Sequence, residues 1–499
     1  MTELLLGVDI GTSSTKGVLA RPDGEIVAST EVPHQTSMPH PGWFEHDAET
    51  MWWQEFVQIA RTLIADAPGP IAAVCSSGIG PCLLPADVNG TPLRPAMLYG
   101  IDTRAEDEIV ELTERFGAER ILERCGSPLT SQAIGPKLLW LRRHEPEVWE
   151  RTRMLLGPNS FIIHRLTGEY VLDQHSASQH DPIYDLADEG WIDDWAEEVA
   201  PGLQLPALAW PGELAGRVHA QGAAETGIPE GTPVAAGTLD AWSESTSAGV
   251  RRPSDTMLMY GSTMFIIEVV EQPRPHPKLW LTVGVDQGTR TLAGGMSTSG
   301  SLTSWLRGIV GGVPFAELLE EARAVPSGSN GLLVLPYFAG ERTPLFDPSA
   351  RGVMFGLTLT HGRGHLYRAL LESTAFGVRH NLEAFREAGG DPGRLVAVGG
   401  GTKGTLWAQI VSDATGLPQE VPAVTIGASY GDAYFAGIAA GLVAQDDEWS
   451  TISDVVEPDP SAKPVYDELY DLYKGLYLAN REDMHRIADL QERGSAGSR

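Results

Sequence analysis

Basic residues, cysteines and long apolar runs are all scarce in this sequence of 499 residues. The 36 lysines and arginines are outnumbered by 66 aspartates and glutamates, which gives a formal net charge of −30. A chain this acidic is not expected to bind nucleic acid or an anionic membrane surface. Any phosphate site in it must therefore supply local cations, either basic side chains or a metal ion.

The three cysteines, Cys75, Cys82 and Cys125, are too few for a disulfide framework and are not spaced like metal ligands. No apolar run approaches the roughly 18 residues of a membrane span, and the N-terminus has no basic, apolar leader. We therefore expect a cytoplasmic protein. The chain is long enough for two or more domains, each with its own core.

Residues 4–27 have the pattern of three short strands joined by two turns. The first turn combines an acid, a glycine, two hydroxyls and a base: Asp9, Gly11, Thr12, Ser13 and Lys16. Glycine lets backbone N–H groups approach a ligand closely, and hydroxyls and a lysine suit phosphate oxygens. A carboxylate beside them would repel phosphate unless Mg²⁺ lay between the two. The alternative is an ordinary polar hairpin turn.

A second turn of this kind occurs 250 residues later, where residues 257–269 give a strand, the turn Gly261-Ser262-Thr263 and another strand. The two turns form a weak internal repeat, with one hydroxyl-rich hairpin in each half of the chain. Two such turns facing each other would hold a polyphosphate from both sides.

Two aspartates follow predicted strands and allow two interpretations each. Asp240 comes after an apolar strand and a glycine, and a carboxylate in that position can act as a catalytic base or as a helix N-cap. Asp102, two residues before Arg104, can be part of a ligand clamp, or an N-cap with a surface ion pair.

An apolar strand over residues 395–401 ends in three glycines. Gly399, Gly401 and Gly404 match the dinucleotide pattern G-x-G-x-x-G, and Glu420 follows about 20 residues later. We discount a Rossmann site because no first βαβ unit leads into the motif, but a nucleotide lying against these glycines remains reasonable. The following residues, 428–442, are rich in glycine and alanine, which close packing of a helix on a sheet requires.

In this order, the motifs resemble those of the FGGY family of carbohydrate kinases, and within it the xylulose kinases and their uncharacterised relatives. The resemblance covers roughly residues 4–440. It rests on Asp9-x-Gly11-Thr12 with Lys16, Asp240, Gly261-Ser262-Thr263, Gly340-Glu341-Arg342-Thr343-Pro344 and Gly399-Gly400-Gly401, with further likeness at 42–47 and 136–141.

The resemblance implies an α/β fold with two ribonuclease-H-like domains of the actin/hexokinase/Hsp70 superfamily and a central cleft. Residues 1–250 would form the N-terminal domain with the sugar site, and residues 251–490 the C-terminal domain with the adenosine pocket. Residues 491–499 are expected to be a disordered tail. ATP, Mg²⁺ and a small-molecule sugar are the implied ligands, and a homodimer is compatible with the family.

The resemblance also implies a role for individual residues. Asp9 would hold Mg²⁺, and Asp240 would accept the proton of the attacking sugar hydroxyl. The phosphates would contact Gly11, Thr12, Ser13, Lys16, Gly261, Ser262 and Thr263. The adenosine pocket would include Gly400, Gly401 and Lys403, and the sugar would contact Ile79, Gly80, Asp102 and Asp240.

The sequence departs from xylulose kinases at the sugar end. Gly78-Ile79-Gly80 stands where those enzymes carry Met-His-Gly, Ala241 replaces an asparagine, and the segment 99–104 is one residue longer. Because polar complementarity discriminates between sugars, the predicted substrate is a ketopentose such as xylulose, with another ketose, a polyol or a sugar acid as alternatives.

Two other classes of protein share this superfold: a catalytically inactive sugar-sensing regulator and an Hsp70-like chaperone ATPase. The presence of Asp9, Asp240 and both hydroxyl-rich turns weighs against the regulator. The chaperone would need a separate peptide-binding region after about residue 440. ADP release stimulated by a sugar separates all three classes.

Overall fold

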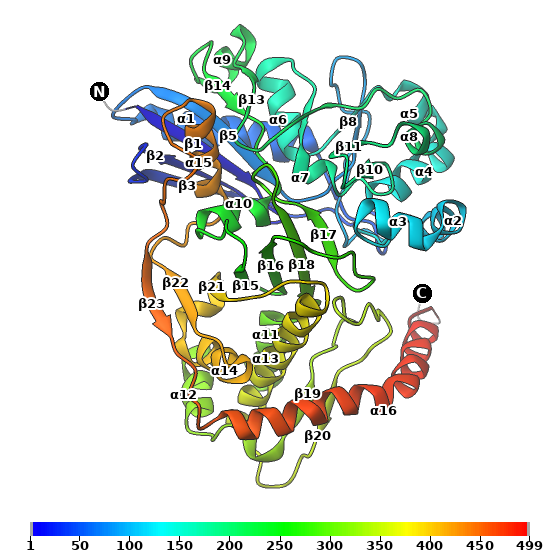
Figure 1. Ribbon diagram of the computed structural model, residues 1–499, viewed down its shortest axis with the longest axis vertical. Coiled ribbons are helices and arrows are strands. Elements are labelled where there is room, and N and C mark those ends of the chain that lie inside the picture. Colours follow the sequence, from blue (N-terminus) through cyan, green and yellow to red (C-terminus); the bar gives the residue numbers. More distant parts are fainter. Residues whose placement is uncertain (1–2, 497–499) are drawn as a thin grey trace.

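Two sheets, one from each half of the chain, organise the protein (Figure 1). The computed structural model describes residues 3–496, apart from the side chains of residues 403, 492 and 494–496. In sheet order, the first sheet contains β13 (Leu214–Arg217), β14 (Pro233–Ala235), β5 (Ile71–Gly78), β1 (Leu4–Ile10), β2 (Ser14–Ala20) and β3 (Ile26–Pro33). The second contains β17 (Trp280–Val283), β18 (Arg290–Met296), β16 (Met264–Val270), β15 (Asp255–Tyr260), β21 (Arg394–Val398), β22 (Gln419–Pro422) and β23 (Ile452–Val456).

The centres of the two sheets have the same arrangement. β1 pairs antiparallel with β2 and parallel with β5, and β15 pairs antiparallel with β16 and parallel with β21. Both predicted hairpins are therefore present, and the internal repeat extends from the turns to the surrounding strands. The prediction of an α/β fold with two similar domains is confirmed.

Helices cover both sheets and fill the connections. The first half contains η1 (Ala48–Gln54), α1 (Glu55–Ala65), α2 (Glu106–Phe116), α3 (Ala118–Cys125), α4 (Ile134–His144), α5 (Pro146–Arg151), α6 (Pro158–Thr167), α7 (Gln174–Ala177), α8 (Asp193–Val199), α9 (Ala220–Thr226) and α10 (Asp240–Ser247). The second contains α11 (Gly300–Ile309), α12 (Phe315–Arg323), η2 (Ser329–Gly331), α13 (Arg363–Glu387), η3 (Gly400–Lys403), α14 (Thr405–Thr415), α15 (Ala428–Ala439) and α16 (Lys463–Ala496). Two-stranded pairs complete the fold: β4 (Glu45–His46) with β7 (Ala96–Met97), β6 (Leu84–Ala86) with β8 (Met154–Leu156), β9 (Val171–Asp173) with β12 (Ala207–Ala209), β10 (Tyr184–Asp185) with β11 (Gly190–Trp191), and β19 (Leu333–Leu335) with β20 (Val353–Phe355).

Helices α10 and α15 each pack on the sheet of the other half. Trp242 of α10 lies in a core cluster with Met257 and Val396 of the second sheet. Helix α15 shares a core cluster with Leu5 and Ala73 of the first sheet, and Figure 1 shows it in orange against the blue strands. The predicted boundary after residue 250 therefore falls in the connection between α10 and β15. The two halves of the chain do not pack independently, because each contributes a helix to the core of the other.

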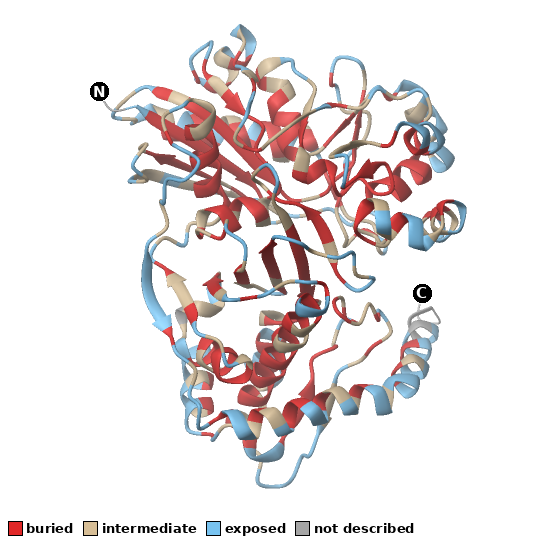
Figure 2. Ribbon diagram, in the orientation of Figure 1, coloured by how far each residue is buried: buried red, intermediate tan, exposed pale blue. Residues whose placement is uncertain are grey.

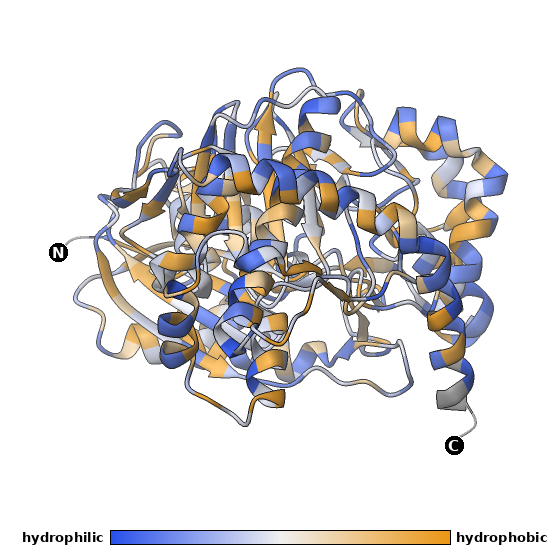
Figure 3. Ribbon diagram, turned by 90° about the horizontal axis from the view of Figure 1, so that it is seen from below, coloured by the Kyte–Doolittle hydropathy of each residue, from blue (hydrophilic) through white to orange (hydrophobic). Residues whose placement is uncertain are grey.

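Helix α16 lies along the outside of the second lobe (Figures 1 and 2). Its inner side buries Tyr466, Tyr470 and Tyr473 in the core of that lobe. The predicted disordered tail is wrong for residues 491–496, which are helical, and residues 497–499 lie outside the described residues. Hydrophilic and hydrophobic residues are mixed along the helix that leads to the C mark in Figure 3. Within residues 3–496, no helix has both the length and the apolar character needed to cross a membrane.

Candidate active site

The turn between β1 and β2 is held in place from one side by His34. The His34 ring lies 3.1 Å from the Gly11 carbonyl oxygen, and its backbone N–H donates to the Ser13 carbonyl at 2.9 Å. The other ring nitrogen of His34 lies 2.8 Å from a carboxylate oxygen of Glu55, on α1. Four predicted phosphate-contacting hydroxyl residues of the two turns remain at least partly exposed: Thr12, Ser13, Ser262 and Thr263.

The second turn, between β15 and β16, rests on the first turn of α11. Gly300 N–H donates to the Gly261 carbonyl at 2.9 Å, and Ser299 N–H donates to the Ser262 carbonyl at 3.0 Å. The Ser299 hydroxyl is buried without a hydrogen-bond partner, so it is free to meet an anion at this helix N-terminus. Sequence reasoning missed α11, although hydroxyl residues ahead of an apolar-periodic run are a helix-start signal.

The glycines after β21 lie at the same sheet edge as the second turn, because β15 and β21 are parallel neighbours. A Cβ on Gly399, whose φ is +90°, would come within 2.7 Å of the Tyr260 carbonyl oxygen. A Cβ on Gly400 would meet nothing within 4 Å, so this glycine faces open space, as a nucleotide pocket requires. Gly401 packs against Tyr260, and the side chain of Lys403 lies outside the described structure.

Asp240 begins α10, at the end of a turn that only glycine can form. Gly237 has a φ of +62°, and a Cβ there would lie 2.0 Å from the Ser76 carbonyl oxygen. The N-cap of α10 is Leu239, so the interpretation of Asp240 as an N-cap is wrong. Its carboxylate accepts a hydrogen bond from Ala241 N–H at 2.7 Å, and burial raises its pKa to about 6.

Asp9 is the other carboxylate of the site and is paired across the hairpin with Lys16. Burial raises the pKa of Asp9 well above its usual range, the charges of Asp240 and Asp432 raise it further, and Lys16 opposes them. A divalent cation would relieve this repulsion, and a carboxylate oxygen is a donor that suits Mg²⁺. No cluster of three or more potential metal-ligating side chains exists among the described residues. Mg²⁺ does not need one, because phosphates and water complete its coordination.

Gln132, which sequence reasoning missed, connects the two segments where the sequence departs from xylulose kinases. Its side-chain amide donates to the Gly80 carbonyl at 3.1 Å and to Gln179 at 3.2 Å. Its amide oxygen accepts from Gly100 N–H at 3.0 Å. No short sequence pattern marks such a residue, because its role depends on segments that meet only in the fold.

Tyr99 and Arg342 add polar groups to the site. The Tyr99 hydroxyl lies 3.2 Å from that of Thr12, so it connects the sugar side with the first phosphate turn. Burial raises the pKa of Tyr99, and the charges of Asp240 and Arg342 act on it in opposite directions. Arg342, from the second half, donates to the Met296 carbonyl at 2.9 Å, while its buried Nε has no partner.

Two residues predicted to contact the sugar are not free to do so in this structure. Ile79 is only 1% exposed, and its side chain belongs to the core of the first lobe. The Asp102 carboxylate is completely buried and is bound by Arg104 and by Phe44 N–H. The N-cap of α2 is Ala105, so Asp102 is neither a cap nor part of a surface ion pair. Gly80 remains partly exposed.

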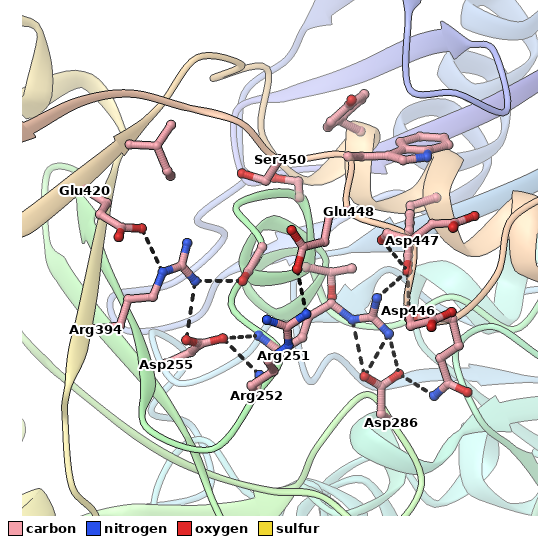
Figure 4. A pocket seen from close by; sticks show the side chains of 18 residues that line it. Arg251, Arg252, Asp255, Asp286, Arg394, Glu420, Asp446, Asp447, Glu448 and Ser450 are labelled. Carbon is pink, nitrogen blue, oxygen red and sulfur yellow. Dashed lines mark hydrogen bonds and ion pairs between the residues drawn. The ribbon is translucent and has the colours of Figure 1, made fainter.

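A cavity of about 670 Å³ lies at the end of α10 farthest from Asp240 (Figure 4). It is lined by two of the places where the chain passes between the halves, within residues 246–255 and 445–452. Its arginines are paired with acids, as with Arg251 and Asp286 at 2.9 Å. None of the residues predicted to bind ATP or sugar lines this cavity, so it is separate from the candidate active site.

Two similar domains, each with a hydroxyl-rich turn at a sheet edge, and two carboxylates close enough to interact are the parts that a two-domain phosphoryl-transfer enzyme uses. The chain belongs to the FGGY family of carbohydrate kinases: the family's N-terminal domain matches residues 4–245 and its C-terminal domain matches residues 256–440. It is therefore an ATP-dependent carbohydrate kinase that uses ATP and Mg²⁺ and acts on a sugar substrate.

Similar proteins include kinases of two substrate types. The xylulose kinase of Bacillus subtilis is 28% identical over 489 residues, which cover 96% of this chain and 97% of the relative. The glycerol kinase of Nocardia farcinica is 30% identical, with 91% and 92% covered. The crystal structure of xylulose kinase from Rhodospirillum rubrum superposes with a TM-score of 0.89 at 32% identity, and covers 97% of this chain and 100% of that one. The predicted family and superfamily are confirmed.

Proposed function

We propose that this kinase phosphorylates a hydroxyl of a ketopentose such as xylulose. Asp240 is the general base, and Mg-ATP lies between the two hydroxyl-rich turns. The observation that carries the proposal is the position of Asp240, a partly exposed carboxylate at a glycine turn, close enough to Asp9 to raise its pKa. The similarity to xylulose kinases over nearly the whole chain supports the substrate.

In the proposed mechanism, most of the catalysis comes from positioning and charge. Thr12, Ser13 and Lys16 hold the phosphates from one side, and the turn at Gly261 holds them from the other. Asp9 holds the Mg²⁺, which neutralises phosphate charge when it is bound. Asp240 accepts the proton of the sugar hydroxyl as that oxygen attacks the γ-phosphorus, and ADP leaves. Closure of the lobes excludes water, which would otherwise hydrolyse ATP.

A polyol is the second candidate substrate. Gly78-Ile79-Gly80 lacks an imidazole, Asp102 is buried, and the glycerol kinase of Nocardia farcinica is as similar to this chain as the xylulose kinases are. A small polyol carries fewer polar groups than a ketopentose and therefore needs fewer hydrogen-bonding partners.

The test is ADP release from Mg-ATP with ketopentoses, other ketoses, polyols and sugar acids, against a control without sugar. Xylulose as the strongest responder supports the proposal, and a polyol as the strongest responder replaces its substrate. A flat panel with sugar binding still detectable by thermal shift would instead indicate a sugar-sensing protein.

Asp240→Asn tests the base directly. We expect turnover to fall by about 10²–10⁴-fold while ATP binding stays nearly unchanged, because the amide cannot accept the proton. Asp188→Asn, at an exposed aspartate, is the surface control. An Asp240→Asn enzyme with more than about a tenth of the wild-type rate would exclude the base role.

A further inference from the structure

Asp432 is a buried carboxylate that the proposed mechanism does not use. It lies on α15, the helix of the second half that packs on the first sheet, and is 0% exposed. Gly7 of β1 makes this packing close, since a Cβ there would lie 2.0 Å from the Ser429 carbonyl oxygen and 3.0 Å from the Asp432 Cβ. Asp432 therefore sits beside β1, the strand that carries Asp9.

Both carboxylate oxygens of Asp432 accept hydroxyl hydrogen bonds. Ser77 donates to one at 2.7 Å, and Ser243 donates to the other at 2.7 Å. Ser77 on β5 is the register partner of Asp9, and Ser243 lies three residues after Asp240 on α10. A single side chain from the second half thus binds a neighbour of each carboxylate in the candidate active site.

Ser77 has only one proton to donate, and the distances indicate where it goes. Its hydroxyl oxygen is 2.7 Å from Asp432 but 3.4 Å from Asp9. The shorter contact is a normal hydrogen bond, and the longer one is near the limit. With the Ser77 proton directed to Asp432, the Asp9 oxygen that faces Ser77 stays available for a cation.

We propose that Asp432 is a positioning residue of the phosphoryl-transfer site: it draws the Ser77 hydroxyl away from Asp9 and fixes α10, which carries Asp240, through Ser243. This inference rests on the roles proposed above for Asp9 and Asp240. It predicts that, without Asp432, Ser77 turns to Asp9 and competes with Mg²⁺ for the carboxylate.

The experiment measures Mn²⁺ binding to the enzyme–ADP complex by electron paramagnetic resonance, together with kcat, the sugar KM and the thermal midpoint. Asp432→Ala is expected to weaken Mn²⁺ binding about tenfold, the effect typical of removing a group that orients a metal ligand. The Ser77→Ala/Asp432→Ala double variant is expected to regain most of that affinity, because no hydroxyl is left to compete for Asp9. Ser77→Ala alone is expected to bind Mn²⁺ as the wild type does.

The outcomes separate positioning from packing. Unchanged Mn²⁺ affinity in Asp432→Ala, or a double variant as weak as Asp432→Ala, would overturn the inference. If Asp432→Ala does not fold, Asp432→Asn replaces it in the same series. The two serines donate to different oxygens of Asp432, and the amide of asparagine keeps only one of these two acceptors. Asp9→Asn is measured alongside: normal Mn²⁺ binding in that variant would reject the proposed metal role of Asp9, whereas a loss there with no effect in Asp432→Ala would reject only the inference about Asp432.

Discussion

At the scale of single residues, the site brings together several acidic side chains whose negative charges repel one another. Burial raises the pKa of Asp240 to about 6 and that of Glu244 to about 7. Burial also raises the pKa of Asp432, and the hydrogen bonds from Ser243 and Ser77 oppose that rise. The nearby positive charge of Lys16 lowers the pKa of Asp9 and Glu244 but does not outweigh burial. A divalent cation bound among these carboxylates would favour their ionised forms and lower these pKa values.

The pKa of Asp240 predicts an acid limb in the pH profile of the enzyme. A general base must be deprotonated to accept a proton, so kcat/KM should fall as the pH drops below about 6, the value to which burial raises this pKa. The measurement is kcat/KM for Mg-ATP between about pH 5 and about pH 8, because this ratio reports the enzyme before the metal and nucleotide have bound. An acid limb centred at about 4, the ordinary value for aspartate, would contradict the prediction.

The site residues that the sequence predicts share one property: each reactive or hydroxyl side chain lies within a few residues of a glycine, in a short local pattern. Asp9 lies at the end of an apolar strand just before a glycine, and Asp240 and the turn at Gly261 come after an apolar strand. Gln132 and Asp432 follow no such pattern, and their partners Gly80 and Ser77 are distant in sequence. Their roles arise only when the sheet edges and α15 come together, so the local sequence does not reveal them.

At the scale of elements, α10 and α15 are the pair that joins the two lobes. The composition of residues 428–442 predicts close packing of a helix on a sheet, and the structure confirms it. The sequence does not indicate which sheet, because hydrophobic pattern shows that a face is buried but not what buries it. The contact is tight on both sides of α15, where a Cβ on Gly431 would lie 2.0 Å from the Ser243 carbonyl oxygen.

Gly7→Ala is predicted to destabilise the protein by about 1–3 kcal/mol, the usual cost of overpacking. Its Cβ would lie 2.0 Å from the Ser429 carbonyl and 2.5 Å from the Ala433 nitrogen, and backbone atoms cannot move aside as a flexible side chain can. The matched control is Gly475→Ala on α16, where a Cβ meets nothing within 4 Å and helix propensity favours alanine by up to about 1 kcal/mol. Chemical denaturation of both variants tests this, and equal midpoints would contradict it.

At the scale of the whole molecule, two of the passages of the chain between the lobes meet at the cavity, one from α10 to β15 and the other from α15 to β23. The ion pair between Arg252 and Glu448 connects these two passages beside the cavity, and Arg394 of β21 pairs with Asp255 at the end of the first passage (Figure 4). Gly249 lies in the first passage with a φ of +74°, and a Cβ there would lie 3.0 Å from the Ser450 Cβ in the second. A side chain at position 249 would therefore press on Ser450 and change the distance between the α10–β15 and α15–β23 connections.

Gly249→Ala is predicted to change kcat and the sugar KM together, although the residue is remote from Asp240. Alanine at positive φ costs about 1–2 kcal/mol of backbone strain. A difference of about 1 kcal/mol in this strain between the open and closed states of the enzyme would change turnover about fivefold. Gly227→Ala is the matched control, because Gly227 has a φ of +80° at the end of α9, away from the hinge, and a Cβ there meets nothing within 4 Å. Both variants should lose similar stability in denaturation, while only Gly249→Ala alters the kinetics. If Gly227→Ala lowered turnover equally, the effect would reflect general destabilisation and not hinge motion; if neither did, the two passages would not limit closure of the lobes around the sugar.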